Sequence, residues 1–213
     1  LGALSPELAA CVRLCSVLGA AFGRDELEWV QDAIERAGAA GTPVDVAYGL
    51  RVLTSERVLV LGGDGRYAFE SALYQDAVYE LLDPAQRAVV HGHALEHWRA
   101  RILAAGEGPE TLEAIARHAA AVGRVEEAAD ALLRLGDRAF ERHRHVEADR
   151  RYTGALELLP AEDARRRMAA LLGRGRCRYR VSRENFLVDS SSELPLRGPL
   201  PRNRVYCCWT SPW

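Results

Sequence analysis

The sequence has 213 residues, of which 48% are hydrophobic and 27% are charged, and its formal net charge is −2. These values are typical of soluble globular proteins and exclude an intrinsically disordered chain. No apolar run approaches the roughly 18 residues that a membrane span needs. No basic region followed by an apolar stretch marks a secretory signal, so we expect a cytoplasmic protein.

The residue usage is unusual in three respects. All 28 basic residues are arginine, the first residue is Leu1, and Met168 is the only methionine. Because the chain opens at Leu1 and its only methionine is Met168, we expect a piece of a longer product. The five cysteines have no repeated spacing, which argues against a disulfide framework and a zinc site. Cys11 and Cys15 share a predicted helix face and are expected to be small buried hydrophobic residues.

The first part of the chain is predicted to be mainly helical. Helical periodicity predicts three helices, over residues 5–18, 25–36 and 44–55. Ser5 can cap the first helix, and Pro6 suits its first position. Aliphatic runs at 58–61 and 67–69, separated by a GGDG turn, predict a β-hairpin. Three helices followed by a hairpin predict a winged-helix-like unit over residues 1–71.

Residues 72–105 are predicted to form two linking helices. Asp83 and Pro84 can cap and start the second of them. On the first, the periodicity predicts an inward face formed by Leu73, Ala77, Val78 and Leu81.

Residues 106–176 are predicted to form tetratricopeptide-like helical repeats. The expected helices cover residues 110–122, 124–140, 144–158 and 162–174. The segment HVEADRRYTGALELLP places Ala148, Tyr152 and Pro160 where such a unit has the small, aromatic and proline residues of its second helix. The predicted fold class is therefore mainly α, with a winged-helix-like unit followed by an array of helical hairpins.

The C-terminal residues have a different composition. Residues 177–213 show no helical or strand periodicity and contain four prolines. We predict a disordered or out-of-frame tail. The alternative is an ordinary C-terminal extension.

One segment resembles a known family. YAFESALYQDAVYELLDPAQRAVVHGHALEHW is similar to a stretch that follows the ATPase core of bacterial AAA/STAND signal-transduction ATPases, which are linked to kinases, cyclases or transcription regulators. The matching residues are Phe69, Ala72, Leu73, Asp76, Ala77, Val78, Tyr79, Leu82, Pro84, Arg87 and His91. Gln75 and Glu70 depart from the arginine and histidine usual in the family. The resemblance extends over about residues 4–175.

The resemblance implies a non-catalytic regulatory and protein-interaction fragment of a larger signalling ATPase. Its partner would be a protein, either the ATPase core in cis or a signalling protein on the repeat surface. The parent would be a serine/threonine kinase, an adenylate cyclase or an ATPase whose catalytic part lies outside this chain. A phosphate loop requires lysine, which the sequence lacks, and no cofactor is expected.

A DNA-binding transcriptional regulator is the alternative function. Between Arg24 and Ser71, five arginines stand against nine acidic residues, a net charge of −4. The helix that would enter the groove, over residues 44–55, offers only Arg51. Because binding to phosphates requires several cations on the presented face, nucleic-acid binding by this unit is disfavoured.

The basic surplus lies later in the chain. From Arg134 to Arg183, fourteen arginines stand against seven acidic residues, a net charge of +7. This surplus predicts a partner-binding surface, although such helix faces are often only solvated and internally paired. The residues of this surface are Arg142, Arg144, Arg150, Arg151, Arg165 and Arg166.

The remaining candidate sites are weak. His93 and His97 could share one helix face as metal ligands do, but no third ligand has a suitable spacing. No nucleophile is accompanied by a base and an orienting acid, so no catalytic residue is assigned. Leu171 and Leu172 are expected to expose apolar surface at the end of the repeats, which predicts self-association of the chain.

Overall fold

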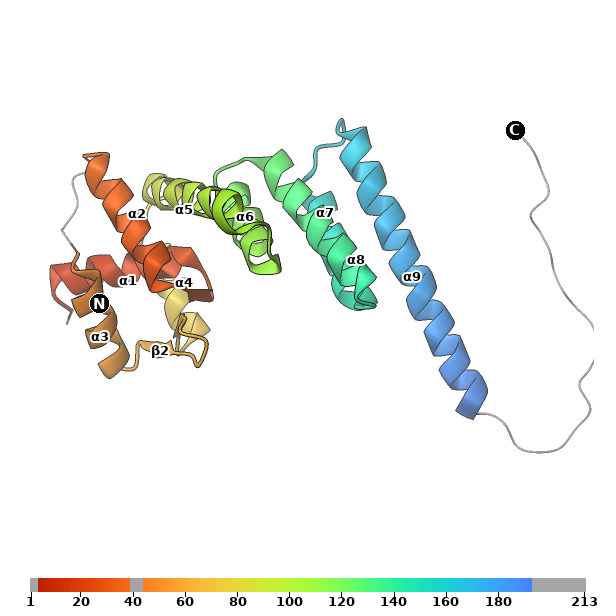
Figure 1. Cartoon of the computed structure of the whole chain (residues 1–213), viewed down its shortest axis with the longest axis horizontal. Helices are drawn as coiled ribbons and strands as arrows, with labels where there is room; N and C mark the ends of the chain where they lie inside the picture. Colours follow the sequence, from red (N-terminus) through yellow and green to blue (C-terminus); the bar gives the residue numbers. More distant parts are fainter. Residues whose placement is uncertain (1–3, 39–43, 193–213) are drawn as a thin grey trace, which may run out of the picture.

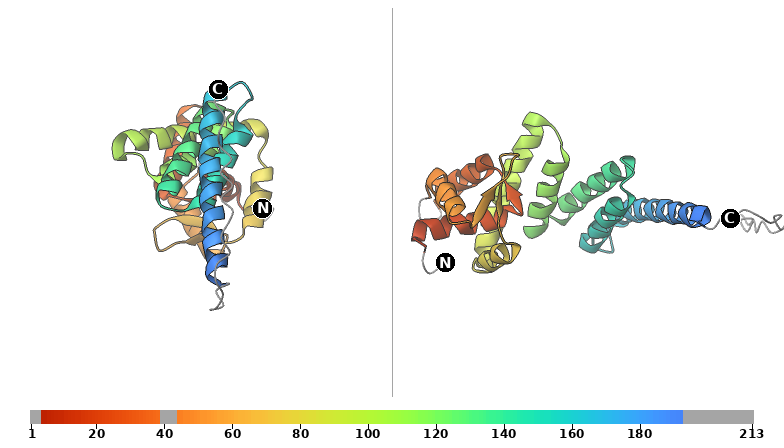
Figure 2. Two further views of the ribbon diagram at one scale, coloured as in Figure 1. Left: turned by 90° about the vertical axis from the view of Figure 1, so that its right-hand side faces the viewer. Right: turned by 90° about the horizontal axis from the view of Figure 1, so that it is seen from below.

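The computed structural model describes residues 4–38 and 44–192, with side chains described as far as residue 182. The chain is mainly helical and carries a small three-stranded antiparallel sheet. The described elements form an elongated row, with the sheet-containing unit at one end and the long helix α9 (Ala164–Ser192) at the other (Figure 1 and Figure 2). Among the described helices, none is both long enough and apolar enough to cross a membrane.

The sheet-containing unit begins with three helices at the predicted places. They are α1 (Pro6–Leu18), α2 (Arg24–Arg36) and α3 (Val46–Ser55). The side chain of Ser5 accepts a hydrogen bond from the backbone N–H of Leu8, and Asp45 caps α3 through the N–H of Tyr48. These caps satisfy N–H groups that have no partner within the helix, which explains where both helices start.

The sheet contains one strand that the sequence did not predict. The predicted hairpin is present as β2 (Leu59–Leu61) and β3 (Tyr67–Phe69). A further strand, β1 (Ala21–Phe22), pairs with β3 in the register Ala21↔Ala68, so the strand order is β1-β3-β2. Two residues are too few to show an alternating pattern, so only pairing with β3 defines this strand.

Two linking helices follow the sheet. In α4 (Ala72–Glu80), Leu73 and Leu81 are 82% and 58% exposed, whereas Val78 is buried. The predicted inward face is therefore wrong except at Val78. The side chains that face α1 are Tyr74, Val78 and Leu82, which follow one another at intervals of four residues. Helix α5 (Pro84–Ala105) begins at a capping box, in which Asp83 and Gln86 satisfy each other's backbone N–H groups.

The hydrophobic cores do not follow the predicted division at residues 71 and 105. Val78 of α4 and Leu82 just after it, together with Val90 and Ala94 of α5, join the core of the sheet-containing unit. The second half of α5 joins the next core through Leu95 and Trp98. Helix α5 therefore belongs to both cores and connects them.

The array consists of α6 (Pro109–Ala121), α7 (Val125–Glu141), α8 (His145–Leu158) and α9, each packed on the one before it. Tyr152 of α8 is 1% exposed and lies against two glycines. A Cβ atom would lie 2.7 Å from its ring at Gly136 and 2.5 Å from its ring at Gly173. The absent side chains let α7 and α9 approach Tyr152 from two sides.

Helix α9 is longer than predicted. It continues to Ser192, so the prediction of irregular structure is wrong for residues 177–192. No proline occurs between Pro160 and Pro195, and Cys177 is fully buried against the array rather than part of a tail. The remaining prediction, for residues 193–213, lies outside the described residues.

Candidate functional site

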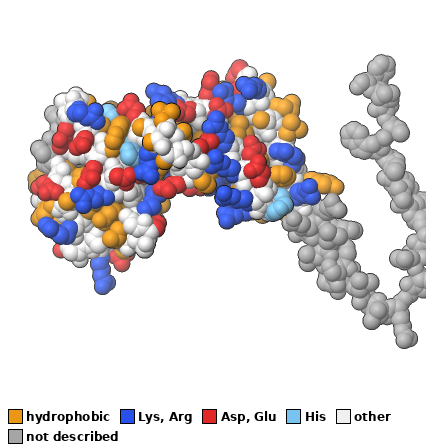
Figure 3. Space-filling view, in the orientation of Figure 1, with side chains coloured by type: hydrophobic (Ala, Val, Ile, Leu, Met, Phe, Trp, Pro, Cys, Tyr) orange, Lys and Arg blue, Asp and Glu red, His pale blue; other side chains and the backbone are white. Residues whose placement is uncertain are grey.

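The structure distributes the six predicted surface arginines along the array. Arg142 and Arg144 lie in the turn between α7 and α8, and Arg165 and Arg166 lie in the first turn of α9. Helix α8 separates these two turns, and 14 residues at about 1.5 Å per residue place them roughly 20 Å apart. Arginines and carboxylates are interspersed on the visible face of the array (Figure 3). The six residues therefore do not form one continuous basic patch.

Three of the six arginines pair with carboxylates. Arg151 of α8 bonds to Glu113 of α6. Arg166 of α9 lies 2.7 Å from Asp130 of α7. Arg144, the residue before α8, lies 3.5 Å from Glu147 in the first turn of that helix. Each of the first two pairs joins helices that are separated by one helix in the chain, α6 with α8 and α7 with α9, so these side chains stabilise the array.

The other three arginines are available to a partner. Arg142, Arg150 and Arg165 are exposed. Within the part of the chain that the structure describes, none of them has a carboxylate within ion-pair distance. Three of the six predicted surface arginines are thus free of ion pairs with the described residues, and they lie at three separate places on the array.

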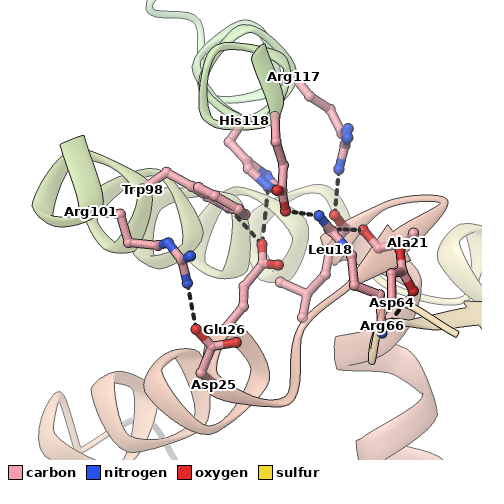
Figure 4. Close-up of polar contacts among 11 residues, drawn as sticks. Leu18, Ala21, Asp25, Glu26, Asp64, Arg66, Trp98, Arg101, Arg117 and His118 are labelled. Carbon is pink, nitrogen blue, oxygen red and sulfur yellow. Dashed lines mark hydrogen bonds and ion pairs between the residues drawn. The ribbon is translucent and has the colours of Figure 1, made fainter. Parts of the chain in front are cut away.

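A second cluster lies buried where the sheet-containing unit meets the array (Figure 4). Glu26 of α2 is only 2% exposed, and its Oε1 accepts a hydrogen bond of 2.7 Å from Nε1 of Trp98 on α5. The Nε2 atom of His118, on α6, lies 3.8 Å from the same oxygen. One carboxylate therefore connects three helices, and its burial requires these partners.

The cluster continues from His118 toward α4. Nδ1 of His118 lies 2.8 Å from Nδ1 of His91, and Nε2 of His91 lies 3.1 Å from the hydroxyl of Tyr79. With both rings neutral, these contacts are satisfied when Tyr79 donates to His91 and His91 donates to His118. The remaining N–H of His118 then faces Glu26. We refer to Glu26, Trp98, His118, His91 and Tyr79 as the junction cluster.

Burial keeps the two histidines neutral. It lowers the pKa of His91 to about 4, and the neighbouring His118 ring and Arg117 add to this effect. Burial also lowers the pKa of His118, although the nearby carboxylate of Glu26 opposes that shift. Neutral, mutually hydrogen-bonded rings of this kind order an interface but provide no group poised for proton transfer near neutral pH.

A polar cleft opens beside the junction cluster. Its two adjoining parts have volumes of about 520 and 270 Å³, and both are lined by Glu26, Asp64, Arg66, Trp98 and Glu110. Most of its charges are already paired, since Arg66 bonds to Glu110 and Arg101 bonds to Asp25. In the same region Arg117 donates to the carbonyl oxygen of Leu18 (Figure 4). The cleft walls therefore hold the two parts of the molecule together.

The structure separates the histidines that the sequence grouped as metal candidates. His91 and His97 are buried on α5, whereas His93 is half-buried and lies 3.7 Å from Glu96. Among the described residues, no three histidine, cysteine or acidic side chains are grouped so that they could hold a metal ion. Cys11 and Cys15 are both fully buried, which confirms the prediction made for them.

The sequence reasoning missed the junction cluster, although one signal pointed to it. Glu26 lies four positions before Val30, which is on the buried face of α2. Helical periodicity therefore places a carboxylate on an apolar stripe, where a charge requires a partner. The identity of that partner, Trp98, is 72 positions away and has no local signature.

Comparisons with known proteins do not assign this chain to a family. No family model matches the sequence, and neither curated proteins nor solved structures show a significant match.

Proposed function

We propose that this chain is a non-catalytic regulatory and protein-interaction module of a larger bacterial signalling ATPase. In this proposal a winged-helix-like unit and tetratricopeptide-like repeats transmit a partner's binding to the ATPase core. The observation that carries the proposal is the order of parts. A small three-helix unit with a sheet leads directly into stacked helical hairpins, and α5 belongs to the cores of both.

The order of elements in the first unit supports the winged-helix part of this proposal. Its order is α1, β1, α2, α3 and then the hairpin β2–β3, with β1 completing the sheet beside β3. Helices followed by a β-hairpin is the order of elements expected for this fold. The first unit thus supports the same proposal as residues 69–91, which resemble a stretch that follows the ATPase core of bacterial signal-transduction ATPases.

Two properties of the array support the interpretation as tetratricopeptide-like repeats, namely the spacing of its residues and the packing of its helices. Leu135 and Gly136, then Ala148, Tyr152 and Pro160, follow the spacing of the repeat pattern, with Ala148 and Tyr152 four positions apart. The close approach of Tyr152 to Gly136 supplies the physical reason for a glycine at that place.

The same spacing extends one repeat toward the N-terminus. Trp98 and His118 lie 34 positions before Leu132 and Tyr152, and 34 residues is the length of this repeat. His118 therefore occupies in α6 the place that Tyr152 occupies in α8. Repeats of this type stack through their neighbours and present extended surfaces to protein ligands, which favours an interaction role.

The test starts from the gene and proceeds to the parent protein. Sequencing the flanking DNA should reveal an ATPase core encoded in frame upstream, and ATP hydrolysis is then measured for the core with and without this chain. We expect the attached module to change the basal rate, because it would pack on the core and restrain it. An open reading frame without such a core, or identical rates, would refute the proposal.

DNA binding is the second candidate, and the geometry of α3 weighs against it. Arg51 is the only arginine of this helix, and its guanidinium lies 5.5 Å from the centre of the Tyr48 ring. A labelled DNA duplex titrated with the chain at about 50 mM and about 200 mM salt decides between the two functions. Binding that weakens steeply with salt would favour the DNA-binding regulator.

A further inference from the structure

The exposed side of α9 has an apolar stripe with arginines on both flanks. Met168, Leu171, Leu172 and Tyr179 are 57%, 45%, 62% and 66% exposed. Their spacing of i, i+3, i+4 and i+11 places them on one side of a helix with 3.6 residues per turn. We call these four residues the α9 stripe.

The α9 stripe lies opposite the side by which α9 is held in the array. Ala170 and Cys177 are fully buried, and Gly173 lies against Tyr152. On the helical wheel these three residues point away from the stripe. The stripe is therefore a second apolar face of a helix that is already anchored, and no described element covers it.

The charge beside the stripe is of one sign. Residues 164–182 contain no aspartate or glutamate. They contain seven arginines, namely Arg165, Arg166, Arg167, Arg174, Arg176, Arg178 and Arg180. Some of these reach back into the array, as Arg178 does to Asp149 at 3.2 Å. Arg165, Arg174 and Arg180 form no ion pair with any residue that the structure describes.

The array itself shows how such arginines are used. Its helices are joined by pairs between an arginine on one helix and a carboxylate on another, such as Arg99 with Glu127 and Arg151 with Glu113. A helix that packed on the α9 stripe would meet arginines, so its own flanks would have to supply the carboxylates. We propose that the α9 stripe binds an amphipathic helix with acidic flanks, supplied by a partner protein.

Two other occupants fit the charge less well. A second copy of this chain, packed through the same stripe, would bring arginines against arginines. The sequence-based expectation of self-association considered Leu171 and Leu172 but not these charges. Residues 193–213 carry three arginines and one glutamate, so they do not complement the face either. The proposal rests on the proposed function and specifies its partner.

The experiment measures fluorescence anisotropy of labelled peptides with the full chain. The probe is a helical peptide of about five turns, with leucines along one side and glutamates flanking them. Two matched peptides replace either the glutamates by lysines or the leucines by glutamines. We expect only the first peptide to bind well, with each replacement weakening binding by about tenfold or more, because both apolar area and opposite charge are required.

Variants of the chain locate the site. Leu172→Glu should weaken binding of the acidic peptide by about tenfold or more, since it places a charge in the apolar contact. Leu103→Glu, at a side chain 90% exposed on α5, is the matched control and should change little. Arg165→Glu, at an exposed residue, tests the charge separately and should also weaken binding. Circular dichroism confirms that each variant is folded.

Several results would overturn the proposal. They are an absence of binding by the acidic peptide, equal binding of the acidic and basic peptides, or equal losses from Leu172→Glu and Leu103→Glu. Sedimentation showing a dimer that only Leu172→Glu disrupts would identify a second copy as the occupant instead. The peptide results do not depend on ATP hydrolysis. A parent that is regulated normally while no peptide binds would therefore refute the docking site and leave the proposed function standing.

Discussion

Trp98 donates its indole N–H to the buried carboxylate of Glu26 over 2.7 Å, which joins α5 to α2 across 72 positions of sequence. The bond lies between two hydrophobic cores, one formed with the sheet and one formed in the array. Because Glu26 is only 2% exposed, loss of this donor would leave its carboxylate poorly solvated.

The first prediction concerns this bond. Trp98→Phe should lower the free energy of unfolding by about 1–3 kcal/mol beyond the loss of apolar area, because a buried carboxylate loses its donor. Trp29→Phe is the control, since this half-buried tryptophan packs on His97 and is not bonded to Glu26. Urea denaturation measures both variants. Equal losses would show that the bond contributes nothing specific.

The second prediction concerns the close contact at Tyr152. Gly136→Ala should destabilise the chain by about 1–3 kcal/mol, because its Cβ atom would overlap the ring and force the helices apart. Gly92→Ala is the matched control on α5, where a Cβ atom would meet nothing within 4 Å. That variant should stabilise the chain by about 0.5–1 kcal/mol through helix propensity. Thermal melts that shift in the same direction for both variants would contradict the packing argument.

The third prediction concerns pH. The pKa of His91 falls from 6.5 to about 4 on folding. The unfolded chain therefore takes up a proton at higher pH than the folded chain does, and stability declines as the pH falls from about 6.5 to about 4. At 1.36 kcal/mol per unit, this shift corresponds to a loss on the order of 3 kcal/mol.

The pH prediction is checked with His91→Asn, whose side chain can still bond to His118 but does not titrate. The free energy of unfolding, measured by urea denaturation at a series of pH values, should depend less on pH in this variant than in the original chain. The carboxylates titrate in both proteins and cancel in the comparison. The same pH dependence in both proteins would exclude His91 as its source.

The fourth prediction concerns the arginines of the array. Arg166 lies 2.7 Å from both Asp130 and Asp163, whereas Arg150 is exposed and has no ion pair among the described residues. Arg166→Gln should therefore cost about 1 kcal/mol, and Arg150→Gln close to none, because only a network of this kind contributes measurably at a surface. The difference should shrink in high salt, where screening weakens the pairs. Equal effects in low salt would argue that Arg166 is only solvated.

Local signals predicted much of the helical structure. The starts of α1 and α5 follow from Ser5 and Asp83, whose side chains cap the backbone next to them. The hairpin follows from its turn sequence and the aliphatic runs on either side. The sequence failed where packing decides between similar alternatives, as it did for the inward face of α4. Both Leu73 and Val78 are apolar, and only contact with α1 buries the second.

The sequence by itself determined that this protein is mainly helical, where most of its helices lie, and that its basic charge is concentrated in the second half. Those properties depend on hydrogen bonds and side-chain spacings within a few residues, so they can be recognised in a short stretch of sequence. Only the tertiary structure decided that Glu26 meets Trp98 and His118, that three of six surface arginines are paired, and that an apolar stripe of α9 faces outward. Each of these depends on which helices pack together, and packing brings together residues whose distance in the sequence carries no information about their contact.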